Sequence, residues 1–141
     1  MTIAVILGGK GHDVVTIDAD ASVRDAVRLL ADNRIGAVPV MADGAVAGVF
    51  SERDLIQHMA RDGVGGLDAP VRTVMTTPVE TIALGEPVLG ALSVMTHRRI
   101  RHLPVVDDGA LIGIVSIGDL VKHRIDRIEA EAAAMRDYIR S

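Results

Sequence analysis

A segment of eight residues occurs twice in this chain, and this repeat constrains the fold more than any other feature. The copies are Gly48–Leu55 (GVFSERDL) and Gly113–Leu120 (GIVSIGDL), with Gly, Ser, Asp and Leu at the same four places. An alignment of Thr16–Leu55 on Thr81–Leu120 needs no gap and contains fifteen identities in forty positions, at an offset of sixty-five residues. The chain is therefore a tandem duplication, which favours two units of one fold.

Each copy has the pattern of a β-α-β-β-α unit. In the first copy a short strand at Val14–Ile17 precedes a helix opened by Ser22, with apolar residues at i, i+3, i+4 and i+7. Two apolar runs then flank Asp43-Gly44, a pair that favours a hairpin because the turn needs positive φ angles. The second copy has its hairpin at Asp108-Gly109. We predict an α+β fold in which the units pack face to face about a pseudo-twofold axis and leave a cleft between them.

The chain divides into three segments that we expect to form one compact module. Residues 1–68 contain a lead-in and the first repeat, residues 69–125 the second repeat, and residues 126–141 a C-terminal helix extension. The lead-in, Met1–Leu7, has the pattern of a short helix or strand. We expect a flexible turn at Gly8–Gly11, because the spacing of a phosphate-binding loop is missing and His12 stands where Ser or Thr is needed.

The last predicted helix is longer than one repeat requires. Its apolar residues are spaced 4, 3, 4, 3 and 4 apart, which is the a/d pattern of a coiled coil over about two and a half heptads. They are Val121, Ile125, Ile128, Ala132, Met135 and Ile139. Two alternatives stay open: this seam packs on a partner chain, or it packs back on the protein's own core.

Composition excludes several classes of function. Aromatic residues make up 1% of the chain and the net charge is −4, so a nucleic-acid partner is not expected. There is no cysteine, and the five histidines form no metal-ligand spacing, so each is assigned to the surface or to a phosphate and no metal site is predicted. The short apolar patch at Ile3–Leu7 cannot span a membrane. We expect a cytoplasmic protein without a membrane partner.

Both copies place a serine and an aspartate where a strand is followed by a helix. Ser51 precedes Asp54 by three residues, and Ser116 precedes Asp119 at the same spacing. A helix N-terminus offers free N–H groups and positive partial charge, so this junction can hold a phosphate while the Asp accepts hydrogen bonds from ribose hydroxyls. Capping alone explains a single isolated copy.

Two pairs of motifs stand at the same offset of sixty-five residues. They are Ile35–Val40 (IGAVPV) with Gly48–Asp54, and Ile100–Val105 (IRHLPV) with Gly113–Asp119. At this spacing they resemble the paired cystathionine β-synthase (CBS) domains, or Bateman modules, over roughly residues 14–125. The resemblance implies a regulatory module that binds AMP, ADP or ATP in the cleft between repeats. S-adenosylmethionine and NAD are alternatives, and no metal is expected beyond nucleotide-associated magnesium.

The resemblance also implies two binding sites that each mix the two copies. In one site Asp119 holds the ribose and Ser116 lies near phosphate, and three residues of the first copy enclose the base: Thr16, Ile35 and Ala37. The other site has Asp54 and Ser51, with three residues around the base: Val79, Thr81 and Ile100.

The two sites are not expected to be equal. Phosphate-binding members of the family often carry basic residues directly after the Ile of the Ile-x-x-x-Pro segment. The second copy has Arg101-His102 at these positions where the first has Gly36-Ala37. A guanidinium makes charge-assisted hydrogen bonds to phosphate. We therefore expect the Asp119 site to be the stronger, with Arg53 as compensation in the other.

Two functions follow from these features. The first is a nucleotide-sensing module, expected to be a homodimer, that transmits ligand binding to a regulated protein of unknown identity. The alternative is a structural dimerisation scaffold with a cleft that binds nothing. No catalytic residues are predicted, because Ser51 and Ser116 have no base near them in the sequence and the acidic residues are explained as caps and turns.

Overall fold

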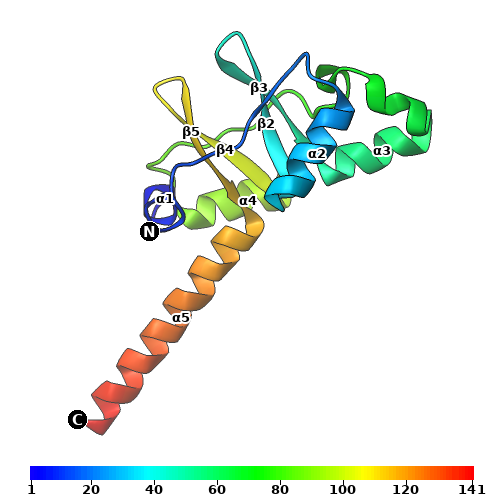
Figure 1. The fold of residues 1–141 in the computed structure, drawn as a ribbon. Coiled ribbons are helices and arrows are strands. Elements are labelled where there is room, and N and C mark those ends of the chain that lie inside the picture. Colours follow the sequence, from blue (N-terminus) through cyan, green and yellow to red (C-terminus); the bar gives the residue numbers. More distant parts are fainter.

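The computed structural model describes all residues from Met1 to Ser141 and contains two α+β units with adjacent hairpins (Figure 1). The first unit consists of β1 (Ile17–Asp18), α2 (Val23–Asn33), β2 (Ala37–Ala42), β3 (Ala45–Ser51) and α3 (Glu52–Asp62). The second consists of α4 (Val88–Arg98), β4 (His102–Asp107), β5 (Ala110–Ser116) and the long helix α5 (Ile117–Arg140). Before and between them lie α1 (Ile3–Lys10) and two short 3-10 helices, η1 (Val64–Asp68) and η2 (Val71–Thr73). The predicted α+β class is confirmed.

The backbone repeats itself at the offset seen in the sequence. In the first unit β1 runs parallel to β2, with Ile17 opposite Val40, and β2 pairs with β3 in a hairpin. In the second unit β4 and β5 form the hairpin, and the opening strand is reduced to one parallel bridge between Ile82 and Val105. The sequence predicts a strand at Val14–Ile17 and another at Val79–Ile82, and both are shorter in the structure. Positive φ angles recur in pairs at Arg34 and Arg99, and at Asp43 and Asp108.

Each repeat completes its core with the segment that precedes the other repeat. Ile3, Ile6 and Leu7 of α1 lie in the core of the second repeat, whereas Val71 of η2 lies in the core of the first. The exchange locks the repeats together, because neither core is whole without a segment from across the cleft. The boundaries predicted from the sequence remain a prediction, and the spatial cores do not follow them.

Two glycines of the repeated motif make room for these exchanged segments. A Cβ on Gly113 would lie 2.9 Å from Leu7 Cδ2, and a Cβ on Gly48 would lie 2.8 Å from the Thr76 carbonyl oxygen. Such distances are too short for any side chain. On the first side, Val49 and Thr76 exchange two backbone hydrogen bonds, of 2.8 and 3.2 Å. The motif glycine is thus a contact point between a strand and the lead-in of the opposite repeat.

The expected turn at Gly8–Gly11 is wrong, because α1 continues to Lys10 and ends at Gly11, whose φ is 101°. Two glycines weaken a helix by about 1 kcal/mol each. The buried side chains of Ile3, Ile6 and Leu7 hold α1 against the second repeat and outweigh that cost. Tertiary packing therefore overrides local propensity here.

One histidine departs from the predicted surface or phosphate role. His58 is buried, its Nε2 lies 2.7 Å from the Gly66 carbonyl oxygen, and its Nδ1 lies 3.2 Å from Asp62 Oδ2. It joins α3 to η1 and is a structural residue. The sequence predicts that the helix opened by Ser51 stops at Gly63, and α3 ends at Asp62, directly before that glycine.

The predicted C-terminal extension is a single helix of 24 residues that projects from the body of the molecule (Figure 1). Its first turn is fixed by the capping box of Ser116 and Asp119 and by Leu120, which is fully buried. Beyond that turn the apolar residues are exposed to solvent. None of the helices combines the length and apolar content needed to cross a bilayer.

The exchanged core makes a stability prediction. Leu7 is 0% exposed, so Leu7→Ala should lower the free energy of unfolding by about 2–5 kcal/mol through lost burial and a residual cavity. Leu89→Ala is the matched control, since Leu89 is 62% exposed and its loss should change stability by about 0.5 kcal/mol or less. Urea unfolding followed by circular dichroism measures both. Equal effects of the two variants would contradict the assigned place of α1 in the core.

Candidate functional site

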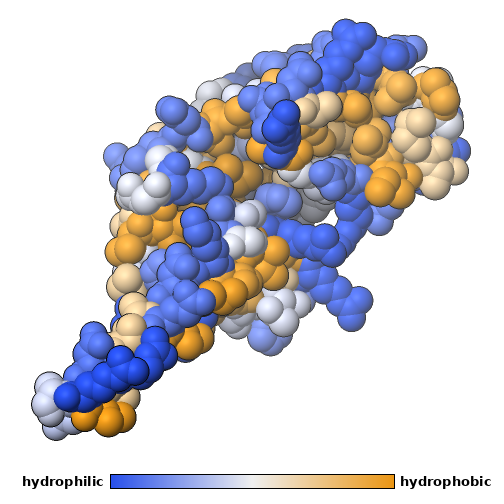
Figure 2. Space-filling view, turned by 60° about the horizontal axis from the view of Figure 1, so that its bottom comes forward, coloured by the Kyte–Doolittle hydropathy of each residue, from blue (hydrophilic) through white to orange (hydrophobic).

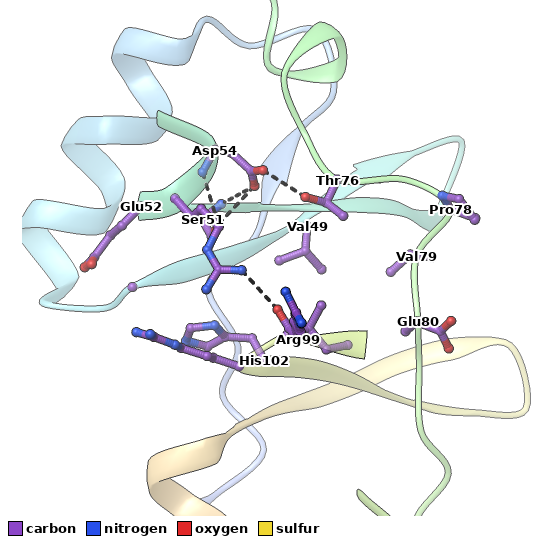
Figure 3. Close-up of a pocket in the computed structure, with 14 residues that line it drawn as sticks. Val49, Ser51, Glu52, Asp54, Thr76, Pro78, Val79, Glu80, Arg99 and His102 are labelled. Atoms are coloured by element: carbon purple, nitrogen blue, oxygen red, sulfur yellow. Dashed lines mark hydrogen bonds between the residues drawn. The ribbon is translucent and has the colours of Figure 1, made fainter. Parts of the chain in front are cut away.

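A cleft between the two repeats encloses about 820 Å³ of open space, counting its solvent-exposed mouth. The enclosed volume that compares with published cavities is about 170 Å³, so the cleft is smaller than most small-molecule sites, which enclose roughly 300–1,000 Å³. The first repeat contributes its β3–α3 junction and the start of β2, the second contributes the turn from α4 into β4, and the connecting chain closes one side (Figure 3). The lining residues are Gly36, Val49, Ser51, Glu52, Arg53, Asp54, Thr76, Pro78, Val79, Glu80, Arg99, Ile100, Arg101 and His102.

The carboxylate of Asp54 is held rigidly at the β3–α3 junction. Its Oδ2 accepts hydrogen bonds from the backbone N–H of Ser51 at 2.9 Å and the Ser51 hydroxyl at 3.1 Å, and its Oδ1 accepts one from the Thr76 hydroxyl at 2.8 Å. The Asp54 N–H in turn donates to Ser51 Oγ at 3.4 Å, which completes a capping box. Asp54 is only 9% exposed. The predicted cap and the predicted ligand contact are therefore the same carboxylate, whose hydrogen bonds to Ser51 and Thr76 are drawn in Figure 3.

A guanidinium spans the cleft. Arg53, in the first turn of α3, donates a hydrogen bond of 3.0 Å from Nη1 to the backbone carbonyl of Arg99 in the second repeat. Arg99 can present that carbonyl because it closes α4 in the left-handed conformation, with φ of 56°. This bond links the site of the first repeat directly to the backbone of the second.

Three guanidinium groups in the cleft have no carboxylate partner. Arg53, Arg99 and Arg101 form none of the ion pairs of the structure, while Glu80 at the rim pairs with Arg98 at 3.5 Å. Unpaired guanidinium groups that converge on one cleft favour an anion, and they bind phosphate oxygens with bidentate geometry. This side of the cleft therefore presents hydrogen-bond donors, and three carboxylates line the same cleft: those of Glu52, Asp54 and Glu80.

The imidazole of His102 is partly buried among charged side chains. Burial lowers the pKa of His102 below its usual value, and Lys10 and Arg101 lower it further against the opposing effects of Glu52 and Asp119. The ring is therefore neutral at pH 7. An anion bound beside it would favour the charged form and raise its pKa.

The Asp119 junction has the same capping box and a different neighbour. The Ser116 N–H donates to Asp119 Oδ2 at 2.8 Å, and the ammonium of Lys10 donates to the same oxygen at 2.6 Å and to the Ile114 carbonyl at 2.8 Å. Burial by itself would raise the pKa of Asp119, but the hydrogen bonds from Lys10 and Ser116 and the charge of Lys10 outweigh it and lower the pKa. Lys10 thus neutralises the carboxylate that was expected to face a ribose.

The structure brings seven of the thirteen predicted site residues together in the cleft: Ser51, Arg53, Asp54, Val79, Ile100, Arg101 and His102. Ser116 and Asp119 lie at the other junction, and four residues do not line this cleft: Thr16, Ile35, Ala37 and Thr81. Arg101 and His102 line the Asp54 cleft, although the sequence argument counted them in favour of the Asp119 site. The reason is geometric, because the start of β4 faces the β3–α3 junction of the opposite repeat.

Sequence reasoning missed several residues of the cleft. The sequence pattern of Thr76-Thr77-Pro78 predicts only a break before the next strand, yet the Thr76 hydroxyl donates a hydrogen bond to Asp54. Arg99 could have been found as the repeat partner of Arg34, since both close a helix with positive φ. Lys10 had no signal beyond its glycine-rich surroundings. No group of three or more His, Cys, Asp or Glu side chains is arranged to hold a metal ion.

Fold and cleft together define a class of protein: a two-repeat α+β module with its pocket at the interface of the repeats. Comparison with known families shows to which family this chain belongs. The model of the CBS domain matches residues 11–61 and 71–126, one match for each repeat, so the chain belongs to the CBS domain family. The matched model describes CBS domains and not a catalytic domain.

Relatives and solved structures are similar along nearly the whole chain. The mitochondrial CBS domain-containing protein CBSX3 of Arabidopsis thaliana is 32% identical over 98% of this chain and 71% of its own length. The CBS domain-containing protein YhcV of Bacillus subtilis is 30% identical over 85% of each chain. The crystal structure of ATU1752 from Agrobacterium tumefaciens is 41% identical, with a TM-score of 0.85 over 88% of this chain and 99% of that one.

The Lys10–Asp119 pair makes a prediction with a defined pH dependence. Because the folded pKa of Asp119 is lowered, the pair stabilises the protein above the unfolded pKa, and this contribution is lost as pH falls through the folded pKa. Lys10→Met, which introduces the residue found at the equivalent position Met75, should cost roughly 0.5–1 kcal/mol at pH 7, since the pair is partly exposed. Urea unfolding at pH 7 and pH 3 measures the loss.

The matched control is Lys122→Met, which removes the other lysine of the chain from an exposed position. It should leave stability unchanged at both values of pH. A cost of Lys10→Met that is equally large at pH 3 would show that Lys10 contributes by packing and not by pairing with Asp119.

Proposed function

We propose that this chain is a regulatory module that binds an adenine nucleotide in the Asp54 cleft, and that AMP, ADP or ATP is its ligand. The observation that carries the proposal is the combination, in one cleft between repeats, of three unpaired guanidinium groups and a rigid buried carboxylate. Phosphate and ribose require these two kinds of group. The proposal contains no catalytic step, because the Ser51 hydroxyl and the Asp54 carboxylate are both engaged in the capping box.

The cleft offers a separate surface for each part of a nucleotide. Val49, Val79 and Ile100 supply apolar contact for an adenine ring. Asp54 supplies acceptor lone pairs for ribose hydroxyls, with Thr76 fixing its orientation. The phosphates are then held by the cleft guanidinium groups and are favoured by the positive end of the α3 dipole.

The charges of the cleft discriminate among adenosine compounds. A solved structure of the CBS domain pair of the protein MJ0100 contains 5'-methylthioadenosine and S-adenosyl-L-methionine, with 23% identity and a TM-score of 0.80 to this chain. That likeness establishes the shared fold alone. Here the unpaired guanidinium groups disfavour a sulfonium cation and favour a phosphate, so we place AMP, ADP or ATP before S-adenosylmethionine. NAD, with two phosphates, remains an alternative, and magnesium would enter only with the nucleotide.

Regulation follows from the position of Arg53. A phosphate in the cleft would contact the guanidinium that already bonds the Arg99 carbonyl across the cleft. Ligand binding would therefore bias the angle between the repeats, and a partner protein that contacts both repeats would sense it. The identity of that regulated protein, and the cytoplasm as its compartment, belong to the same proposal.

The phosphate assignment is tested with Arg101→Ala. Loss of one charge-assisted contact of about 1.5–3 kcal/mol should weaken AMP binding by roughly 10–150-fold and leave adenosine binding unchanged, because adenosine has no phosphate. Arg61→Ala, on the exposed last turn of α3, is the matched control and should bind AMP as the unmodified protein does. Isothermal titration calorimetry measures both ligands. Equal losses for AMP and adenosine would remove Arg101 from the phosphate site, and no binding of any adenosine compound would overturn the proposal.

The neutral imidazole predicts a pH-dependent affinity. If a phosphate raises the pKa of His102, binding takes up a proton, so the affinity for AMP should gain about threefold to tenfold from His102 as the pH falls from 8 to 6. Titrations of the unmodified protein and of His102→Gln at each pH isolate this gain, since the titration of the ligand phosphate is common to both. Parallel pH profiles for the two proteins would place the phosphate away from His102.

A further inference from the structure

The outer part of α5 exposes a row of large apolar side chains that nothing in the chain covers. Ile128 is 51% exposed, Met135 61% and Ile139 73%. α5 extends well beyond the body (Figure 1), and Figure 2 shows hydrophobic side chains along this projecting arm between charged ones. A soluble helix that buries no face is marginally stable alone. The arm therefore carries a surface that needs a partner.

The apolar row has the geometry of a coiled-coil seam. Val121, Ile128 and Met135 take the d positions of a heptad, and Ile125, Ala132 and Ile139 take the a positions. Leu120 and Arg127 mark the side of α5 that faces the body, since Leu120 is buried and Arg127 lines a hollow with residues of the lead-in and α4. At about 100° per residue the seam lies roughly a third of a turn from that side, so the body does not block it.

The flanking charges select the partner and its direction. Positions e are Lys122, Glu129 and Arg136, and positions g are Arg124, Glu131 and Tyr138. In a parallel pair of identical helices, each g residue faces the e residue five positions later on the partner. Arg124 then faces Glu129, and Glu131 faces Arg136, which gives four attractive pairs in the symmetric dimer. Glu131 already lies 3.3 Å from Arg127 of its own helix and has room for both.

An antiparallel pair of the same helices has the opposite electrostatics. In the register that uses the whole seam, e residues face e residues and g residues face g residues. Glu129 then meets the Glu129 of the second copy, Glu131 meets its equivalent, and Lys122 meets Arg136. These three contacts join like charges and the fourth, between Arg124 and Tyr138, contains no ion pair, so the sequence of α5 disfavours this arrangement.

We propose that α5 joins two copies of this chain as a parallel two-stranded coiled coil over Val121–Ile139. The first turn of α5 is already formed in each chain, because the capping box and the buried Leu120 hold it in place. The helix therefore does not have to be nucleated when the two copies meet. The two bodies then lie side by side at one end of the coiled coil. This inference does not depend on nucleotide binding.

Cysteine cross-linking tests whether the two α5 helices are parallel. The chain contains no cysteine, so only the introduced residues can form disulfides. In the parallel dimer, Ile125→Cys and Ile139→Cys should each form a disulfide with the same position of the second copy under mild oxidation. Ala130→Cys, at an outward f position, is the matched control and should not. Non-reducing gel electrophoresis of the full chain measures the yield. Failure of both single variants, or an equal yield for Ala130→Cys, would overturn the proposal, as would cross-linking only when Ile125→Cys and Met135→Cys are combined.

Charge reversal tests the pairing independently. Glu129→Arg places like charges opposite Arg124 and should weaken the dimer, whereas the double variant Arg124→Glu with Glu129→Arg should restore it. Sedimentation equilibrium measures the dimer dissociation constant, and circular dichroism checks that each variant is folded. A monomeric unmodified chain, a trimer, or a dimer unaffected by Ile128→Lys with Met135→Lys would each overturn the coiled coil.

Discussion

The exchange of lead-in segments is the constraint on which the rest of the structure depends. α1 fills the core of the second repeat, and the segment around Val71 fills the core of the first. Each exchanged segment passes over a glycine of the opposite hairpin, where a larger residue would collide with it. The exchanged segments therefore hold the two repeats face to face.

The same exchange explains why the two equivalent junctions differ. The residues that approach each junction come from the lead-in segments, and these have diverged more than the junctions themselves. Lys10 and Gly11 correspond to Met75 and Thr76 at the offset of sixty-five residues. One carboxylate is therefore paired with an ammonium, whereas the other accepts a neutral hydroxyl and stays in reach of the cleft guanidinium groups. A single charged residue in a lead-in segment separates one junction from the other.

The sequence predicted what depends on local pattern. The β-α-β-β-α order, the hairpin turns with positive φ at Asp43 and Asp108, the caps at Ser51 and Ser116, and the end of α3 before Gly63 follow from patterning and turn chemistry, and the structure has them. Contacts between distant segments could not be predicted in this way. The burial of α1, the bracing of Asp54 by Thr76 and the ion pair of Lys10 all join residues far apart in the chain. The cleft that Arg101 lines could not be predicted for the same reason, since it depends on which repeat the start of β4 faces.

In the proposed function, the guanidinium of Arg53 couples nucleotide binding to the angle between the two repeats. Arg53 uses one of its five N–H groups on the Arg99 carbonyl, so the others can reach a phosphate without breaking that bond. A ligand held in this way would favour the arrangement in which both contacts are made. The free energy by which it stabilises that arrangement would grow with the logarithm of the ratio of ligand concentration to dissociation constant. Because the cores are already locked by the exchanged segments, the freedom that remains for a ligand to remove lies in the angle between the repeats. A parallel coiled coil would carry that angle to a second body, since α5 begins at the β5 strand of the same repeat whose Arg99 accepts the bond from Arg53.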